Sequence, residues 1–244
     1  MYDAKQHIIN KLQKDILQWQ GFTPPKAGML KGIGLGPMER AFPNGVFPTG
    51  NIHEMICPTP EQAAATSGLM SGIIAFLMKN GGACLWISNG RKQFPPALMT
   101  FGVVPDKVIF IDVARERDVL WAMEEALKCE GIAAVIAEVR EISFAQSRRL
   151  QLAVESSKVT GFLLRNDPSK LGTTTCVARW QITSLPSQLK DELPGVGFPR
   201  WQVDLLRVRN GNPGSWKLEW ADNCFIPLED EEELLQQLDE RRAG

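Results

Sequence analysis

The chain has 244 residues, enough for one large domain or two small ones with a substantial buried core. Its 27 lysines and arginines balance 28 aspartates and glutamates, and the net charge of −1 excludes a global attraction to nucleic acid or to anionic membranes. Five well-separated cysteines without a CxxC pair argue against disulfides and zinc and favour a reducing, cytoplasmic setting. We expect neither a signal peptide nor a membrane span, because no apolar run is long enough.

The N-terminal region is predicted to be an amphipathic helix over residues 4–20, followed by a segment rich in glycine and proline. The apolar stripe of this helix consists of Ile9, Leu12, Ile16 and Trp19. A helix of about four turns is marginal alone, so the stripe is a candidate partner-binding surface, or it folds back on its own core. The Gly/Pro-rich segment is either a linker or an ordered arm wrapped on the core.

Beyond residue 50, short apolar runs rich in β-formers alternate with helical periods. We expect strands at residues 51–56, 83–88, 107–113, 132–138 and 160–165. We expect helices near residues 61–79, 95–102, 116–129 and 143–157, the last with Ser143 as its N-cap. This alternation predicts an α/β fold with a mainly parallel sheet covered by helices on both faces.

The C-terminal third has a different texture, with alternating stretches typical of antiparallel strands. They are "TCVARWQITSL", "RWQVDLLRVRN" and "SWKLEWAD", with a hairpin connection at residues 210–215. The sequence therefore divides into an N-terminal helix and arm (1–45), a core (46–227) and a charged tail (228–244).

The stretch "GNIHEMICPTPEQAAATSG" resembles the strand, phosphate loop and helix of the RecA-type ATPase core. The positions of the loop glycine, the phosphate-binding lysine and the Mg²⁺-binding hydroxyl are occupied by Gln62, Ala63 and Ala64. The position of that family's catalytic glutamate falls near Asn89. Glu138 ends the fourth predicted strand, where the family has an acidic residue linked to Mg²⁺, but a solvated strand terminus is the simpler interpretation of Glu138. The resemblance implies a RecA-like P-loop fold with a degenerate phosphate loop, no cofactor and no ATP hydrolysis.

A closer resemblance, over residues 42–222, is to the ImuA family of RecA- and SulA-related mutagenesis proteins. It is carried by "FPNGVFPTGNIHE", "LWAMEEALKCEGIAAVI", "SRRLQLA" and "GFPRWQVDLLRVRNGNPGSW". The family implies a cytoplasmic, SOS-induced role in DNA repair and translesion synthesis, beside a polymerase-like ImuB-type protein and an error-prone replicative-type polymerase, with RecA a further candidate partner. Two alternatives remain open: a SulA-like inhibitor that binds the tubulin-like division protein, and a divergent NTPase.

No catalytic constellation stands out in the sequence. Glu124 and Glu125 are adjacent on a helix and point about 100° apart, so they cannot form an acid/base dyad. His7 and His53 are too isolated for a metal site or a triad. We therefore expect a binding protein rather than an enzyme.

Local basic residues are the candidates for a weak or indirect DNA contact. They are Arg148, Arg149, Arg165, Lys170, Arg179, Arg207 and Arg209. For the helix arginines the alternative is ion pairing with a neighbour such as Glu155, and for residues 165–176 it is an ordinary polar crossover. The arginines of "RWQVDLLRVRN" form either a basic patch or the charged protection of an edge strand.

Overall fold

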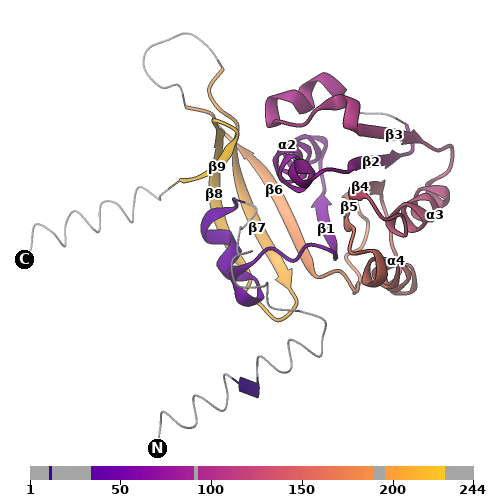
Figure 1. Ribbon diagram of the computed structural model, residues 1–244. Coiled ribbons are helices and arrows are strands. Elements are labelled where there is room, and N and C mark those ends of the chain that lie inside the picture. Colours follow the sequence, from indigo (N-terminus) through magenta and orange to yellow (C-terminus); the bar gives the residue numbers. More distant parts are fainter. Residues whose placement is uncertain (1–10, 13–33, 91–92, 189–195, 229–244) are drawn as a thin grey trace, which may run out of the picture.

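A computed structural model describes residues 11–12, 34–90, 93–188 and 196–228. The core of this part of the chain is one nine-stranded sheet with the order β3-β2-β4-β5-β1-β6-β7-β8-β9 (Figure 1). The strands are β1 (Ile52–Cys57), β2 (Ala83–Ser88), β3 (Val108–Asp112), β4 (Ile132–Val139), β5 (Thr160–Asn166), β6 (Ala178–Leu185), β7 (Arg200–Val208), β8 (Gly214–Ala221) and β9 (Cys224–Leu228). The predicted α/β class is confirmed.

The sheet changes direction at β6. Strands β1 to β5 pair in parallel, and β6 joins β1 in parallel through pairs such as His53 with Ala178. Strands β6 to β9 then form an antiparallel meander, with a register shift in β6 between Arg179 and Trp180. Since β7 is paired on both sides, the interpretation of this strand as a charge-protected edge is wrong.

Helices cover both faces of the parallel half (Figure 1). Helix α2 (Pro60–Leu77) lies on one face, and α3 (Glu116–Leu127) and α4 (Phe144–Ser157) lie on the other. The 3-10 helices of the described residues are η1 (Gly36–Ala41), η2 (Pro43–Gly45), η3 (Met78–Asn80), η4 (Pro95–Phe101) and η5 (Pro105–Lys107). The two faces bury separate apolar clusters, which is the layer arrangement that alternating strands and helices predict. No helix within the described residues is long and apolar enough to cross a membrane.

Two local predictions have instructive outcomes. Helix α4 begins as expected at Ser143, whose hydroxyl accepts from the Gln146 amide while the Gln146 side chain accepts from the Ser143 amide, forming a capping box. The segment predicted as a helix near residues 95–102 is instead the 3-10 helix η4, which starts at Pro95 and is capped at its C-terminal end by Gly102 in the left-handed conformation.

Residues 34–47 form an ordered arm on the core rather than a linker. Leu35, Met38, Phe42 and Phe47 are buried in the same cluster as α2. Of the predicted N-terminal stripe, only Leu12 lies within the described residues, where it is helical and 54% exposed. The other members, Ile9, Ile16 and Trp19, lie outside them, so the stripe as a partner-binding surface stays a prediction.

Candidate functional site

The segment that corresponds to the phosphate loop is short, because α2 begins at Pro60. Only Pro58 and Thr59 separate the end of β1 from the first residue of the helix. The Thr59 hydroxyl accepts from the Gln62 amide at 3.3 Å, and the Thr59 carbonyl accepts from the Ala63 amide at 3.0 Å. The Gln62 and Ala63 amides are thus engaged within the helix start, and Pro58 and Pro60 have no N–H to offer a phosphate.

The side chains at these positions do not replace the lost groups. Gln62 donates to the Thr183 hydroxyl of β6 at 3.2 Å, which ties the loop to the sheet. Ala63 and Ala64 carry neither charge nor hydroxyl, and Asn89 lies in an exposed bend after β2. These positions therefore supply no lysine, no hydroxyl for Mg²⁺ and no carboxylate to activate water.

Glu138, at the carboxyl end of β4, is held by its neighbours. One carboxylate oxygen accepts from the Trp86 indole N–H at 2.7 Å, and the other accepts from the Asn166 amide at 3.1 Å. This corrects the interpretation of Glu138 as a merely solvated strand terminus. Its neutral hydrogen-bond donors fix its position and leave its charge in place.

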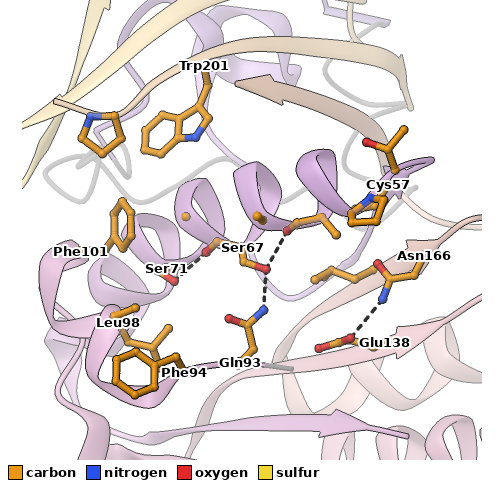
Figure 2. A pocket seen from close by; sticks show the side chains of 18 of the residues that line it. Cys57, Ser67, Ser71, Gln93, Phe94, Leu98, Phe101, Glu138, Asn166 and Trp201 are labelled. Carbon is orange, nitrogen blue, oxygen red and sulfur yellow. Dashed lines mark hydrogen bonds between the residues drawn. The ribbon is translucent and has the colours of Figure 1, made fainter. Parts of the chain in front are cut away.

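A pocket of about 640 Å³ lies along α2 at this end of the sheet. Small residues of α2 form its floor, and Figure 2 shows Phe94, Leu98, Phe101 and Trp201 gathered at one end, with Glu138 and Asn166 at the other. The aromatic wall approaches closely because Gly68 has no side chain: a Cβ there would lie 3.2 Å from ring atoms of Phe101 and Trp201. The volume is in the range of ordinary ligand sites, and the lining is mainly apolar.

Burial shifts the pKa values of two side chains of β1, Cys57 and His53. Burial raises the pKa of the Cys57 thiol to about 11, so this lining residue is neutral at pH 7 and a poor nucleophile. His53 is fully buried and stacked between Phe47 and Phe162, and burial lowers its pKa to about 4. Within the described residues, no group of three or more histidines, cysteines and carboxylates is arranged to hold a metal ion.

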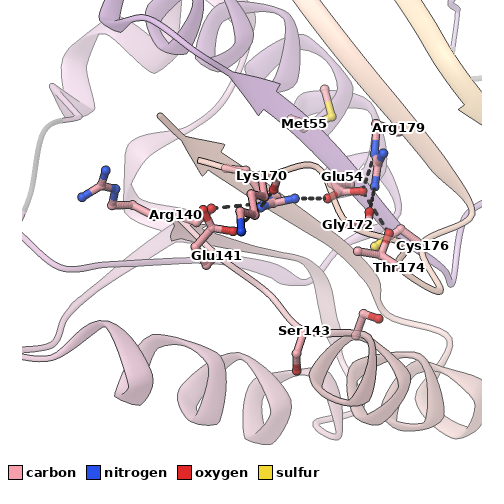
Figure 3. Close-up of polar contacts among 12 residues, drawn as sticks. Glu54, Met55, Arg140, Glu141, Ser143, Lys170, Gly172, Thr174, Cys176 and Arg179 are labelled. Atoms are coloured by element: carbon pink, nitrogen blue, oxygen red, sulfur yellow. Dashed lines mark hydrogen bonds and ion pairs between the residues drawn. The ribbon is translucent and has the colours of Figure 1, made fainter. Parts of the chain in front are cut away.

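A buried ion-pair network is centred on Glu54 of β1 (Figure 3). Glu54, which is 0% exposed, accepts from Arg165 at 2.9 Å, from Arg179 at 2.8 Å and from the Thr174 hydroxyl at 3.0 Å. Arg165, also 0% exposed, donates further to Glu141 at 2.8 Å and to the Lys170 carbonyl at 2.8 Å. The network ties the connection between β5 and β6 to the sheet.

This arrangement corrects the expectation that Arg165 and Arg179 face phosphate, because their guanidinium groups are turned inward and engaged. Arg207 donates to the Thr174 and Cys176 carbonyls, both at 3.1 Å, and Arg209 donates to the Thr175 carbonyl. One guanidinium nitrogen of each of these two arginines is therefore engaged by the same connection, which weakens the basic-patch interpretation, although Arg209 stays exposed.

The remaining three cations are spread over other surfaces. Arg149 pairs with Glu124 at 2.6 Å rather than with Glu155. Arg148 and Lys170 are exposed and have no ion pair within the described part of the chain. The structure therefore does not assemble the seven candidates into one nucleic-acid surface.

Sequence reasoning missed two parts of this site. The aromatic wall joins η4 to β7, about a hundred residues apart in the chain, and no local pattern links them. The role of Glu54 emerges only from Arg165 and Arg179 on the neighbouring strands β5 and β6. A charged residue inside an otherwise apolar strand was the available signal.

Comparisons with known proteins agree with this architecture. The chain is similar in fold to a crystal structure of the RadB recombinase, with a TM-score of 0.57 and 13% identity, over 81% of this chain and 99% of that one. No family model matches the sequence. Protein ImuA of Caulobacter vibrioides, in strains NA1000 / CB15N and CB 15, is 31% identical over 194 residues, which cover 75% of this chain and 80% of the relative. By this identity and coverage, the chain belongs to the ImuA family and has a RecA-like recombinase fold.

Proposed function

We propose that this protein is a non-catalytic accessory factor of SOS-induced translesion DNA synthesis, which recruits or scaffolds an error-prone polymerase complex at damaged DNA. Family membership supports the link to DNA damage, and the closed phosphate loop supports binding without catalysis. The direct partners in this proposal are a polymerase-like ImuB-type protein and an error-prone replicative-type polymerase, with RecA a further candidate.

The observation that carries the proposal is the start of α2 at Pro60. A phosphate loop needs free backbone amides and a lysine, whereas here the Gln62 and Ala63 amides bond to Thr59 and the lysine position is Ala63. The charged residues among the described lining of the adjacent pocket, Glu138 and Asp167, are both acidic and would repel a triphosphate.

The arrangement of the cations supports a weak or indirect contact with DNA. Five of the candidate arginines bond to carbonyls or carboxylates of this chain, as described above. Binding through Arg148 and Lys170 alone would involve few phosphates, and each contact on a single strand contributes a salt slope of about −0.7.

A thermal-shift titration with Mg-ATP tests whether the protein binds nucleotide, with an active RecA-type ATPase as positive control. Ligand at a hundredfold excess over its Kd stabilises a protein by about 2.7 kcal/mol, so millimolar Mg-ATP that raised the melting temperature by several degrees would contradict the proposal and favour the divergent NTPase.

A genetic arm tests the biological role. Deletion of the gene should abolish damage-induced mutagenesis, and affinity capture from damaged cells should recover the two polymerase-type partners. Mutagenesis at the wild-type level in the deletion strain would refute the role. Filamentation on overexpression, with capture of the tubulin-like division protein, would favour the SulA-like alternative.

A further inference from the structure

The pocket along α2 has a charge pattern that suits a basic partner. Its described lining contains two acidic residues, Glu138 and Asp167, and no lysine or arginine. Asp167 pairs with Arg140 at 3.2 Å, while within the described residues both oxygens of Glu138 accept only from neutral N–H groups. A cation that approached Glu138 would therefore gain a charge-assisted hydrogen bond in a partly apolar setting.

The other end of the pocket suits a large apolar side chain. Phe101 and Trp201 face each other with ring centroids 6.0 Å apart, and Leu98 closes the end beside them. Figure 2 shows these side chains at the opposite end of the pocket from Glu138. A single apolar group and a single cation, separated by the length of the pocket, would satisfy both ends.

Apolar surface continues outside the cavity, which distinguishes a macromolecular partner from a small ligand. Phe94, at the rim, is 67% exposed, and Met99, on the same 3-10 helix, is 64% exposed. On the opposite side, Phe198 is 39% exposed and precedes the lining residue Pro199. Exposed aromatic groups around a cavity are typical of protein interfaces, where a few buried anchors dominate the binding free energy.

We propose that this pocket, which lies where a RecA-type ATPase would hold its nucleotide, receives a segment of a protein partner that inserts one large apolar side chain beside Phe101 and Trp201 and places a lysine or arginine at Glu138. The inference rests on the proposed absence of nucleotide, since both occupants need the same space. It names the chemistry of the partner segment, which the proposed function leaves open.

A display selection tests the inference with a defined probe. A library of random peptides of about twelve residues is selected on the full-length protein, and enriched peptides are resynthesised for titration by fluorescence polarisation. We expect a shared pattern of one bulky apolar residue with a lysine or arginine a few positions away. No enrichment, or enrichment of acidic peptides, would overturn the proposal.

Matched variants locate the binding. Ala64 lines the pocket and is exposed, so Ala64→Phe should fill the cavity without disturbing the core and weaken the peptides at least about tenfold. Ala145→Phe makes the same change at an exposed position of α4 and should leave binding unchanged. Equal affinity for the wild type and Ala64→Phe would place the peptides elsewhere and refute the inference.

A second pair keeps the test valid if Ala64→Phe does not fold. Phe94→Ala removes the exposed rim aromatic and should weaken binding, whereas Phe144→Ala removes a phenylalanine that is 56% exposed on α4 and should not. Glu138→Gln should selectively weaken basic peptides relative to versions in which the cation is replaced by alanine. A Mg-ATP thermal shift would refute the proposed function, whereas peptide binding insensitive to every pocket variant refutes only this inference.

Discussion

Replacement of Arg165 by methionine should destabilise the protein strongly, because this side chain lies inside the sheet. Its guanidinium donates to Glu54 at 2.9 Å, to Glu141 at 2.8 Å and to two backbone carbonyls. Removing one partner of a buried ion pair costs about 3–5 kcal/mol. Glu54 keeps Arg179 and Thr174, so we expect the loss in unfolding free energy at the lower end, near 3 kcal/mol.

The assay is urea unfolding followed by circular dichroism, with Arg149→Met as the matched control. Arg149 forms an ion pair with Glu124, but its side chain is 64% exposed. Exposed pairs contribute about 0–1 kcal/mol, so the control should unfold close to the wild type. If Arg165→Met lost no more stability than Arg149→Met, the guanidinium would be dispensable inside the chain, and the assignment of Arg165 to a structural network would be refuted.

Burial lowers the pKa of His53 to about 4 from its usual 6.5. As the pH falls from 6.5 to 4, the unfolded chain therefore binds a proton at His53 that the folded chain does not bind. The folded state should lose ~3 kcal/mol between pH 6.5 and 4, and the loss in urea midpoints should be shallower in His53→Phe; parallel pH profiles would contradict this. Gly72→Ala should lower the melting temperature despite the better helix propensity of alanine, because its Cβ would lie 2.6 Å from Phe225 and 2.7 Å from Trp220, and overpacking costs about 1–3 kcal/mol; an unchanged or raised temperature would show that the rings move freely. Ser143→Ala should cost about 1 kcal/mol through the lost capping box, and Ser143→Asp, which preserves an acceptor at the N-cap, should recover most of it.

The parallel half of the fold was predictable because its elements are local. The strand at residues 83–88 appears at the expected bounds, and the helix after Ser143 begins where its capping residues indicate. Strand β9 was missed, since Pro227 lies within it and an acidic run follows it. Proline is tolerated there because β9 is paired only with β8 and forms the edge of the sheet.

The candidate site was harder to predict because its properties depend on contacts between distant segments. Arginines at strand positions give the same sequence signal whether they face solvent or a buried glutamate, and only the pairing of β1 with β5 and β6 decides between these. The missing lysine was visible in the sequence. The short loop was also predictable, since the expected strand end at residue 56 and helix start at residue 61 each lie one residue from the observed ones. The bonds from the Gln62 and Ala63 amides to Thr59 were not, because they depend on the geometry of the helix start.

The position of β1 in the sheet has a consequence for how the chain folds. Both neighbours of β1 come from much later in the chain: Ile52 pairs with Gly161, and His53 pairs with Ala178. On the ribosome, β1 therefore emerges long before either partner strand, and closing such long loops makes parallel sheets slow to form. The meander from β6 to β9 pairs strands that are neighbours in sequence, so it can fold quickly once these residues have been synthesised. It then offers a template on which β1 completes the sheet. Until then, β1, which is buried along its whole length in the native protein, lacks both partner strands and is exposed to non-native pairing.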